Sequence, residues 1–170
     1  MSSAIKWADG APDAAARIGE LARGTTVAVA ESCTAGLVAR ALAAVPDSSE
    51  WFRGGVVAYQ RDVRYRVLGV LPGPVVTPAV AEQMARGVAR LLRADVAVAT
   101  TGAAGPDPLD GAPPGTVVTG IWLHGRTWSQ VHEFAGGPTS VVEQAARAAL
   151  DDLATLLDAA AAHPPLRAAG

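Results

Sequence analysis

Two stretches of the chain, residues 25–30 and 95–100, contain short runs of alternating valine and alanine with no helical period. Such runs are typical of strands that are covered on both faces of a sheet. Other short apolar or alternating runs also predict strands, at residues 56–59, 116–123 and 127–134. A turn at His124, Gly125 and Arg126 joins the last two into a hairpin.

Apolar residues at intervals of three and four predict five helices between these strands. They occupy about residues 13–24, 34–45, 61–69, 77–92 and 140–157. The start signals are Asp13 as a cap, Thr77 before Pro78, and Ser140 with Glu143 in a capping box. One helical turn is also expected near residues 48–52.

The apolar stripes of the helices predict which side chains form the core. In the fourth helix the stripe consists of Val80, Met84, Val88, Leu91 and Leu92. In the third helix we expect the valines and Leu68 to point inward and the arginines to point outward.

The order of these elements predicts an α/β fold, a three-layer α/β/α sandwich around a mixed sheet. We expect a single domain over residues 1–170, with a core at about residues 12–158. The N-terminal arm, including Trp7, and the tail after Asp158 are expected to be loose.

Composition narrows the classes of function. Half of the 170 residues are apolar, 18% are charged, and the formal net charge is −2 without a basic run. These values argue against nucleic acid or a membrane surface as a partner. No secretion signal or membrane span is evident, and with the single cysteine we expect a cytoplasmic protein. One cysteine and three scattered histidines argue against a metal site.

The sequence AESCTAGL at residues 30–37 is the first candidate for chemistry, because Ser32, Cys33 and Thr34 lie where a strand turns into a helix. The first amides of a helix favour an oxyanion or a phosphate. The alternative is that Ser32 or Thr34 only caps the helix. The second candidate is the loop TGAAGPDPLDGAPPG at residues 101–115, which also follows a buried strand, where ligands gather in such sheets.

Five segments in register resemble the CinA C-terminal, or nicotinamide-nucleotide amidase, family. They are AESCTAGL, SSEWFRGGVVAY at 48–59, LGV at 68–70, TGAAGPD at 101–107 and GTV at 115–117. The resemblance covers about residues 14–157. It implies a stand-alone form of the domain, a homo-oligomer, and hydrolysis of nicotinamide mononucleotide, a pyridine nucleotide, to nicotinate mononucleotide and ammonia, without a metal or another cofactor.

The resemblance also assigns roles to residues. Ser32 is the nucleophile, Tyr59 lies in the site, and Arg64 takes the position of the family's catalytic lysine. Thr34 and the helix amides hold the substrate or the oxyanion, and Cys33 is a competing nucleophile on chemical grounds. The second loop approaches the nucleotide through Thr101, Gly102, Ala104 and Gly105.

Several charged positions differ from the family pattern. Arg64 replaces the lysine that takes the serine proton, and an arginine stays protonated at neutral pH. Ala112, Gly137 and Pro138 stand where the family has charged residues, and Val142 and Glu143 replace two arginines.

Three hypotheses follow from these features. The first is an amidohydrolase that acts on a pyridine nucleotide or a related amide, with slow turnover because Arg64 cannot act as the base. The second is a catalytically silent member that binds a nucleotide-like ligand or a partner protein. The third, a generic flavodoxin-like binding protein, does not account for the ordered motifs.

Overall fold

A computed structural model describes residues 11–162, which fold around one five-stranded mixed sheet in the order β2-β1-β3-β4-β5. The three parallel strands are β1 (Val27–Glu31), β2 (Phe52–Val57) and β3 (Val96–Gly102). Next to β3 lie the antiparallel strands β4 (Thr116–Leu123) and β5 (Arg126–Glu133). The predicted mixed sheet is therefore confirmed.

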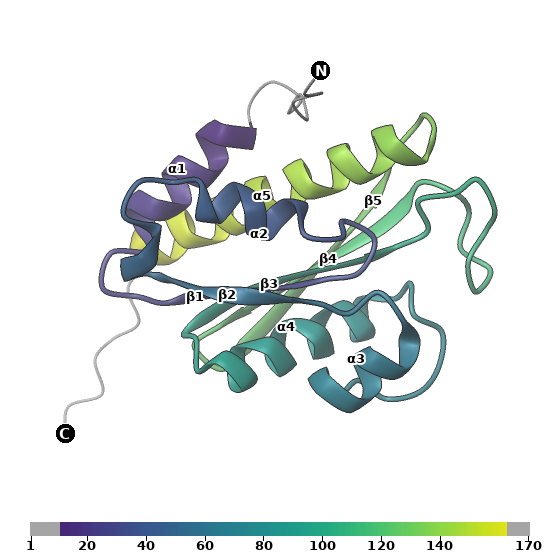
Figure 1. Ribbon diagram of the computed structural model, residues 1–170, viewed down its shortest axis with the longest axis horizontal. Helices are drawn as coiled ribbons and strands as arrows, with labels where there is room; N and C mark the ends of the chain where they lie inside the picture. The colour runs from purple at the N-terminus through teal and green to yellow at the C-terminus, as the bar shows by residue number, and fades with distance from the viewer. Residues whose placement is uncertain (1–10, 163–170) are drawn as a thin grey trace, which may run out of the picture.

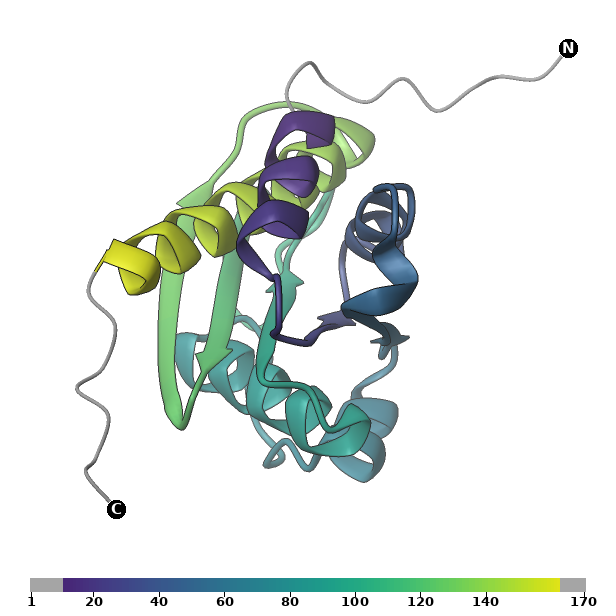
Figure 2. The same ribbon diagram turned by 90° about the vertical axis from the view of Figure 1, so that its left-hand side faces the viewer.

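Helices cover both faces of the sheet and give the predicted three layers (Figures 1 and 2). One face carries α1 (Ala11–Leu21), α2 (Leu37–Ala43) and α5 (Pro138–Ala162). The other carries α3 (Arg61–Leu68) and α4 (Pro78–Leu92), and a short 3₁₀ turn, η1 (Ser48–Glu50), precedes β2. None of the helices formed by residues 11–162 is both long enough and apolar enough to span a bilayer.

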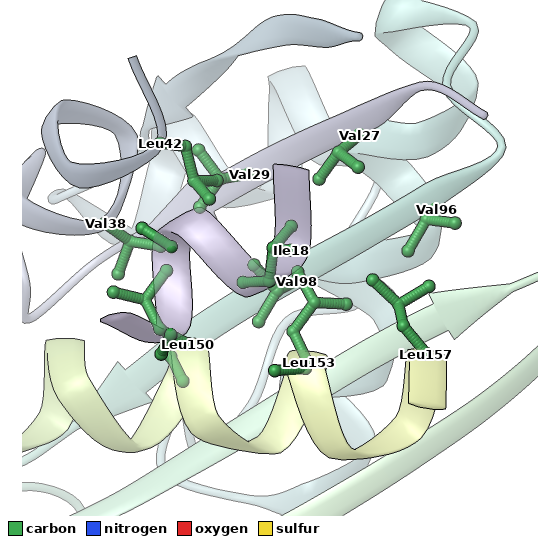
Figure 3. Close-up of a cluster of buried hydrophobic side chains, with 14 of the residues drawn as sticks. Ile18, Val27, Val29, Val38, Leu42, Val96, Val98, Leu150, Leu153 and Leu157 are labelled. Atoms are coloured by element: carbon green, nitrogen blue, oxygen red, sulfur yellow. The ribbon is translucent and has the colours of Figure 1, made fainter. Parts of the chain in front are cut away.

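Two apolar layers hold the sheet between the helices. Beneath α1, α2 and α5, Ile18, Val29, Val98 and Leu150 are fully buried, and Figure 3 shows these side chains pointing toward one another. On the opposite face alanines of β1 and β3 pack against the apolar stripe of α4. Because alternate residues of a strand point to opposite faces, the alanine and valine runs serve both layers.

Several predicted signals agree with the structure. The Thr77 side chain accepts a hydrogen bond from the Val80 backbone N–H at 3.2 Å, so Thr77 caps α4 ahead of Pro78. His124 and Gly125 both have positive φ between β4 and β5, as the tightest hairpin turns require.

Three predicted element starts are wrong. Asp13 lies inside the first turn of α1, which begins at Ala11. Ser140 likewise lies inside α5, which begins at Pro138 because the Val141 N–H already bonds the Gly137 carbonyl at 3.0 Å. Strand β2 begins at Phe52 rather than after the glycines, since Gly54 and Gly55 themselves pair with β1.

The predicted orientations also need correction. In α4, Leu91 is 49% exposed, and in α3, Val67 is 41% exposed. Arg64, expected to point outward, is only 4% exposed because it lies on the same face of α3 as the buried Leu68. The helix α5 continues to Ala162, past the expected start of a loose tail. The predicted arm at residues 1–10, with Trp7, and the end of the tail lie outside the described residues.

A test of the packing between α3 and α4 uses Gly87, in the middle of α4. A Cβ at Gly87 would collide with the backbone carbonyl of Leu68. Alanine normally favours a helix over glycine by about 1 kcal/mol, but overpacking typically costs about 1–3 kcal/mol.

We therefore expect Gly87→Ala to lower the free energy of unfolding in urea. Leu91→Ala, at an exposed position of the same helix, should change it by less than about 0.5 kcal/mol. A more stable Gly87→Ala protein would mean that α3 and α4 are not in this close contact.

Candidate functional site

The turn after β1 holds Ser32 at the carboxyl end of the sheet. The Ser32 N–H donates to the Thr100 carbonyl at 3.1 Å, which extends the pairing of β1 with β3 by one residue. Ser32 is 6% exposed and borders a cavity, and its hydroxyl forms no hydrogen bond with another described residue. The hydroxyl is therefore available to a ligand.

The first amides of α2 are not available to a ligand, because Glu31 occupies them. This carboxylate, 1% exposed, accepts backbone N–H groups of Gly36, Val38 and Ala39 at 2.8–3.1 Å. It also accepts the Thr34 hydroxyl at 2.6 Å. The helix begins only at Leu37, so Ser32 lies before the helix rather than at its end.

The cavity beside Ser32 has a volume of about 660 Å³, enough for a mononucleotide. It lies beyond the carboxyl ends of β1, β2 and β3, where ligands bind in sheets of this kind. The loop between β3 and β4, which projects from the right-hand end of the molecule in Figure 1, forms one side. Its lining comes from four parts of the chain, Ser32–Cys33, Tyr59–Arg61 with Arg64, residues 102–109, and Pro138–Thr139 with Val142.

The structure brings Ser32, Tyr59 and Arg64 to the same cavity. Tyr59 is 63% exposed, so its ring offers an aromatic surface to a ligand. Arg64 is buried, and its guanidinium donates to the Tyr59 carbonyl at 3.1 Å. Burial, together with the nearby Arg61, lowers the pKa of Arg64.

The predicted substrate-binding residues divide into two groups. Gly102, Ala104 and Gly105 line the cavity. Thr34 and Thr101 are fully buried and do not line it. The Thr34 hydroxyl contacts the Glu31 carboxylate, as described, and the Thr100 hydroxyl at 2.7 Å.

Thr101 and Gly102 belong to β3 rather than to the loop. The Thr101 hydroxyl donates to the Val75 carbonyl at 2.7 Å and accepts from Arg64 at 3.5 Å, so it positions Arg64. A Cβ at Gly102 would meet Val117 and the Thr116 carbonyl. This glycine therefore allows β4 to approach β3, whereas Gly105 gives the loop a residue with φ of 93°.

The competing nucleophile, Cys33, also borders the cavity but is chemically quiet. Burial raises the pKa of the Cys33 thiol to about 12, from an ordinary value of 9.0. A thiol reacts as the thiolate, and with this pKa very little of Cys33 is thiolate at neutral pH. Of the two neighbouring residues, Ser32 is therefore the better candidate for a nucleophile.

Sequence reasoning missed two features of the cavity, Asp107 and the contribution of Thr139, and it left open whether Arg61 or a water takes the place of the missing base. Asp107 is the one carboxylate among the lining residues that the structure describes, and it lies in the loop already singled out. The start of α5 lines the cavity through Pro138 and Thr139, far away in sequence. Arg61 also lines it but forms an ion pair with Asp110 at 2.6 Å, so this arginine is already neutralised.

No three histidine, cysteine, aspartate or glutamate side chains gather into a possible metal site within residues 11–162. His132 Nε2 contacts the Asp152 carboxylate at 2.8 Å, on the side of the β4–β5 hairpin that faces away from α4.

The role of Glu31 predicts a loss of stability in Glu31→Gln. The neutral amide would turn one acceptor oxygen into a donor that faces backbone N–H groups, and hydrogen bonds to a charged group contribute about 1.5–3 kcal/mol each. We expect the free energy of unfolding to fall by about 2–4 kcal/mol in denaturant titrations. Glu50→Gln, at an exposed position, is the control, and an equal effect of both changes would refute the role of Glu31.

The raised pKa of Cys33 predicts that the native thiol resists alkylation at pH 8, while the unfolded chain reacts quickly. Because the chain has one cysteine, labelling followed by mass spectrometry reports this residue alone. The unfolded thiol ionises near pH 9 and the native thiol near 12, so this group lowers stability progressively as the pH rises from about 9 to 12. Rapid labelling of the folded protein at pH 8 would show that the Cys33 thiol is reactive and would make it a candidate nucleophile again.

Comparison with known proteins identifies relatives over most of the chain. The family model for the CinA C-terminal domain matches residues 13–157. A CinA-like protein of Shewanella loihica is 38% identical over 141 residues, which are 79% of this chain and 33% of that protein. A putative competence-damage inducible protein of Geobacillus kaustophilus is 47% identical over 110 residues, 61% of this chain and 26% of that protein. The chain thus spans about a quarter to a third of these relatives' length.

Solved structures agree with the sequence match. The competence damage-inducible protein A of Klebsiella pneumoniae has a TM-score of 0.84 at 34% identity, covering 88% of this chain and 98% of that one. The competence/damage inducible protein of Agrobacterium tumefaciens has a TM-score of 0.82 at 32% identity, covering 93% and 99%. The chain belongs to the CinA C-terminal domain family.

Proposed function

We propose that the cavity is an amidohydrolase site of the nicotinamide-nucleotide amidase type. The Ser32 hydroxyl attacks the carboxamide carbon of nicotinamide mononucleotide, and ammonia leaves. Water then cleaves the acyl ester, which releases nicotinate mononucleotide and regenerates the serine. The observation that carries the proposal is that Ser32, Tyr59 and Arg64, from three segments of the chain, line one cavity.

The lining supports this substrate class. Tyr59 offers an aromatic face on which a pyridine ring can pack, and the glycine-containing loop after β3 brings backbone close to the ligand. Because the raised pKa of Cys33 keeps its thiol protonated at neutral pH, Ser32 is the available nucleophile.

The phosphate of a mononucleotide has fewer cations here than the family pattern provides, because Ala112, Gly137 and Pro138 are uncharged. The start of α5 partly compensates. Pro138 and Thr139 line the cavity, and the free amides of a first helical turn carry partial positive charge. We therefore expect weak phosphate binding, with much of the substrate's affinity coming from its ring.

A second candidate function is ligand binding without catalysis, and Arg64 is the observation that favours it. A base must take the Ser32 proton, and a positioned base typically contributes about 10²–10⁴-fold to the rate. An arginine with a lowered pKa is still protonated at neutral pH, and Arg61 is held by Asp110. Native turnover should therefore be slow.

An assay of ammonia release from nicotinamide mononucleotide tests the proposal. We expect the native chain to be slow or inactive and Arg64→Lys to be faster, because a buried lysine can lose its proton. Ser32→Ala in the lysine background should remove the gained activity. Arg66→Lys, an exposed position on the same helix, is the matched control and should leave the rate unchanged.

Two outcomes would contradict the assignment. Turnover that survives Ser32→Ala would exclude the serine as nucleophile. Failure of Arg64→Lys to gain activity, in a variant that still binds nicotinate mononucleotide in a calorimetric titration, would favour the silent binding function.

A further inference from the structure

The three arginines of α3 differ in their partners. Arg61 pairs with Asp110 at 2.6 Å, and Arg66 pairs with Asp62 at 2.7 Å. Arg64 is the most buried of the three, at 4% exposed, and forms no ion pair with any residue of the described part of the chain. The arginine with the least access to water is thus the one without a counter-ion.

The hydrogen bonds of Arg64 do not supply the missing negative charge. Its two acceptors are neutral, the Tyr59 carbonyl at 3.1 Å and the Thr101 hydroxyl at 3.5 Å. Its Nε is fully buried and has no hydrogen-bond partner among the described residues. A guanidinium has five N–H donors, so most of its hydrogen-bonding capacity is unused. A buried cation in this state is costly, and an arginine cannot relieve the cost by losing its proton.

Arg64 lines the same cavity as Ser32. Ser32 bonds to the carbonyl of Thr100, and the next residue, Thr101, accepts from Arg64. Ser32 reaches the cavity from the turn after β1, and Arg64 reaches it from α3. Arg64 also lowers the pKa of Cys33 against the larger effect of burial, which is consistent with this arrangement.

We propose that Arg64 turns the cavity into a site for a carboxylate, so that the chain binds the acid form of its ligand in preference to the amide. A carboxylate near Ser32 supplies the missing negative charge and can accept two parallel N–H groups from one guanidinium. A carboxamide supplies only one acceptor oxygen, and its NH₂ group directs further donors toward a donor-only side chain. The choice of a pyridine nucleotide as the ligand rests on the proposed function, whereas the preference for a carboxylate rests on Arg64 alone.

A preference for the acid has a consequence for turnover. The acid is the product of amide hydrolysis, so a chain with this preference retains its product. Slow chemistry and slow release then act together, and the protein is occupied by the acid whenever the acid is present at a concentration near its Kd.

Calorimetric titrations of the native chain with nicotinate mononucleotide and nicotinamide mononucleotide test the proposal. Both ligands carry the same phosphate and ribose, so the ratio of their affinities isolates the carboxylate. We expect the acid to bind about ten- to a hundredfold more tightly. Arg64→Met should reduce the ratio to about one, and Arg66→Met should leave it unchanged, with circular dichroism confirming that both variants are folded.

Benzoate and benzamide provide a second acid–amide pair that contains no nucleotide. If neither mononucleotide binds but benzoate is preferred over benzamide only when Arg64 is present, the carboxylate site stands and the proposed substrate is wrong. Equal binding of the two mononucleotides, or a preference that survives Arg64→Met, would overturn the carboxylate site and leave the amidase proposal intact. The absence of binding by either acid would also overturn it.

Discussion

A single buried carboxylate organises the end of the sheet where the cavity lies. Glu31 is the last residue of β1 and gathers one hydroxyl and three backbone amides, from Thr34 to Ala39. These bonds fix the turn that carries Ser32 and also the start of α2, whose unpaired amides would otherwise need another acceptor. The position of Ser32 therefore depends on the buried Glu31 carboxylate, which does not itself line the cavity.

The second constraint is the burial of charge at Arg64. Its place on the inner face of α3 next to Leu68, and its bond to Thr101 in β3, hold the guanidinium against the sheet. A lysine in the same position could exchange its charge for a neutral amine, and an arginine cannot. The same burial that would prepare a lysine for proton transfer thus leaves an arginine as a fixed positive charge at the cavity that Ser32 lines.

Sequence patterns predicted the fold well, because strands buried on both faces and amphipathic helices have clear periods. The element order and the mixed sheet followed from them, and so did the convergence of Ser32 and the loop after β3 on one cavity. The errors arose where tertiary contacts override local signals. Ser140 and Glu143 match a capping box, yet α5 starts two residues earlier, and Arg64 is charged yet faces inward.

The roles within the site were harder to predict for a related reason. Thr34, Thr101 and Ser32 are all small hydroxyl residues at strand ends, and only their partners distinguish them. Two of these hydroxyls are taken up by Glu31 and Val75, which leaves Ser32 facing the cavity. Polar groups inside a protein are nearly always paired, so an unpaired one on a cavity is informative. By that criterion, the Ser32 hydroxyl, which bonds to no other residue of 11–162, and Arg64, which has no counter-ion among those residues, are the strongest candidates for contact with a ligand.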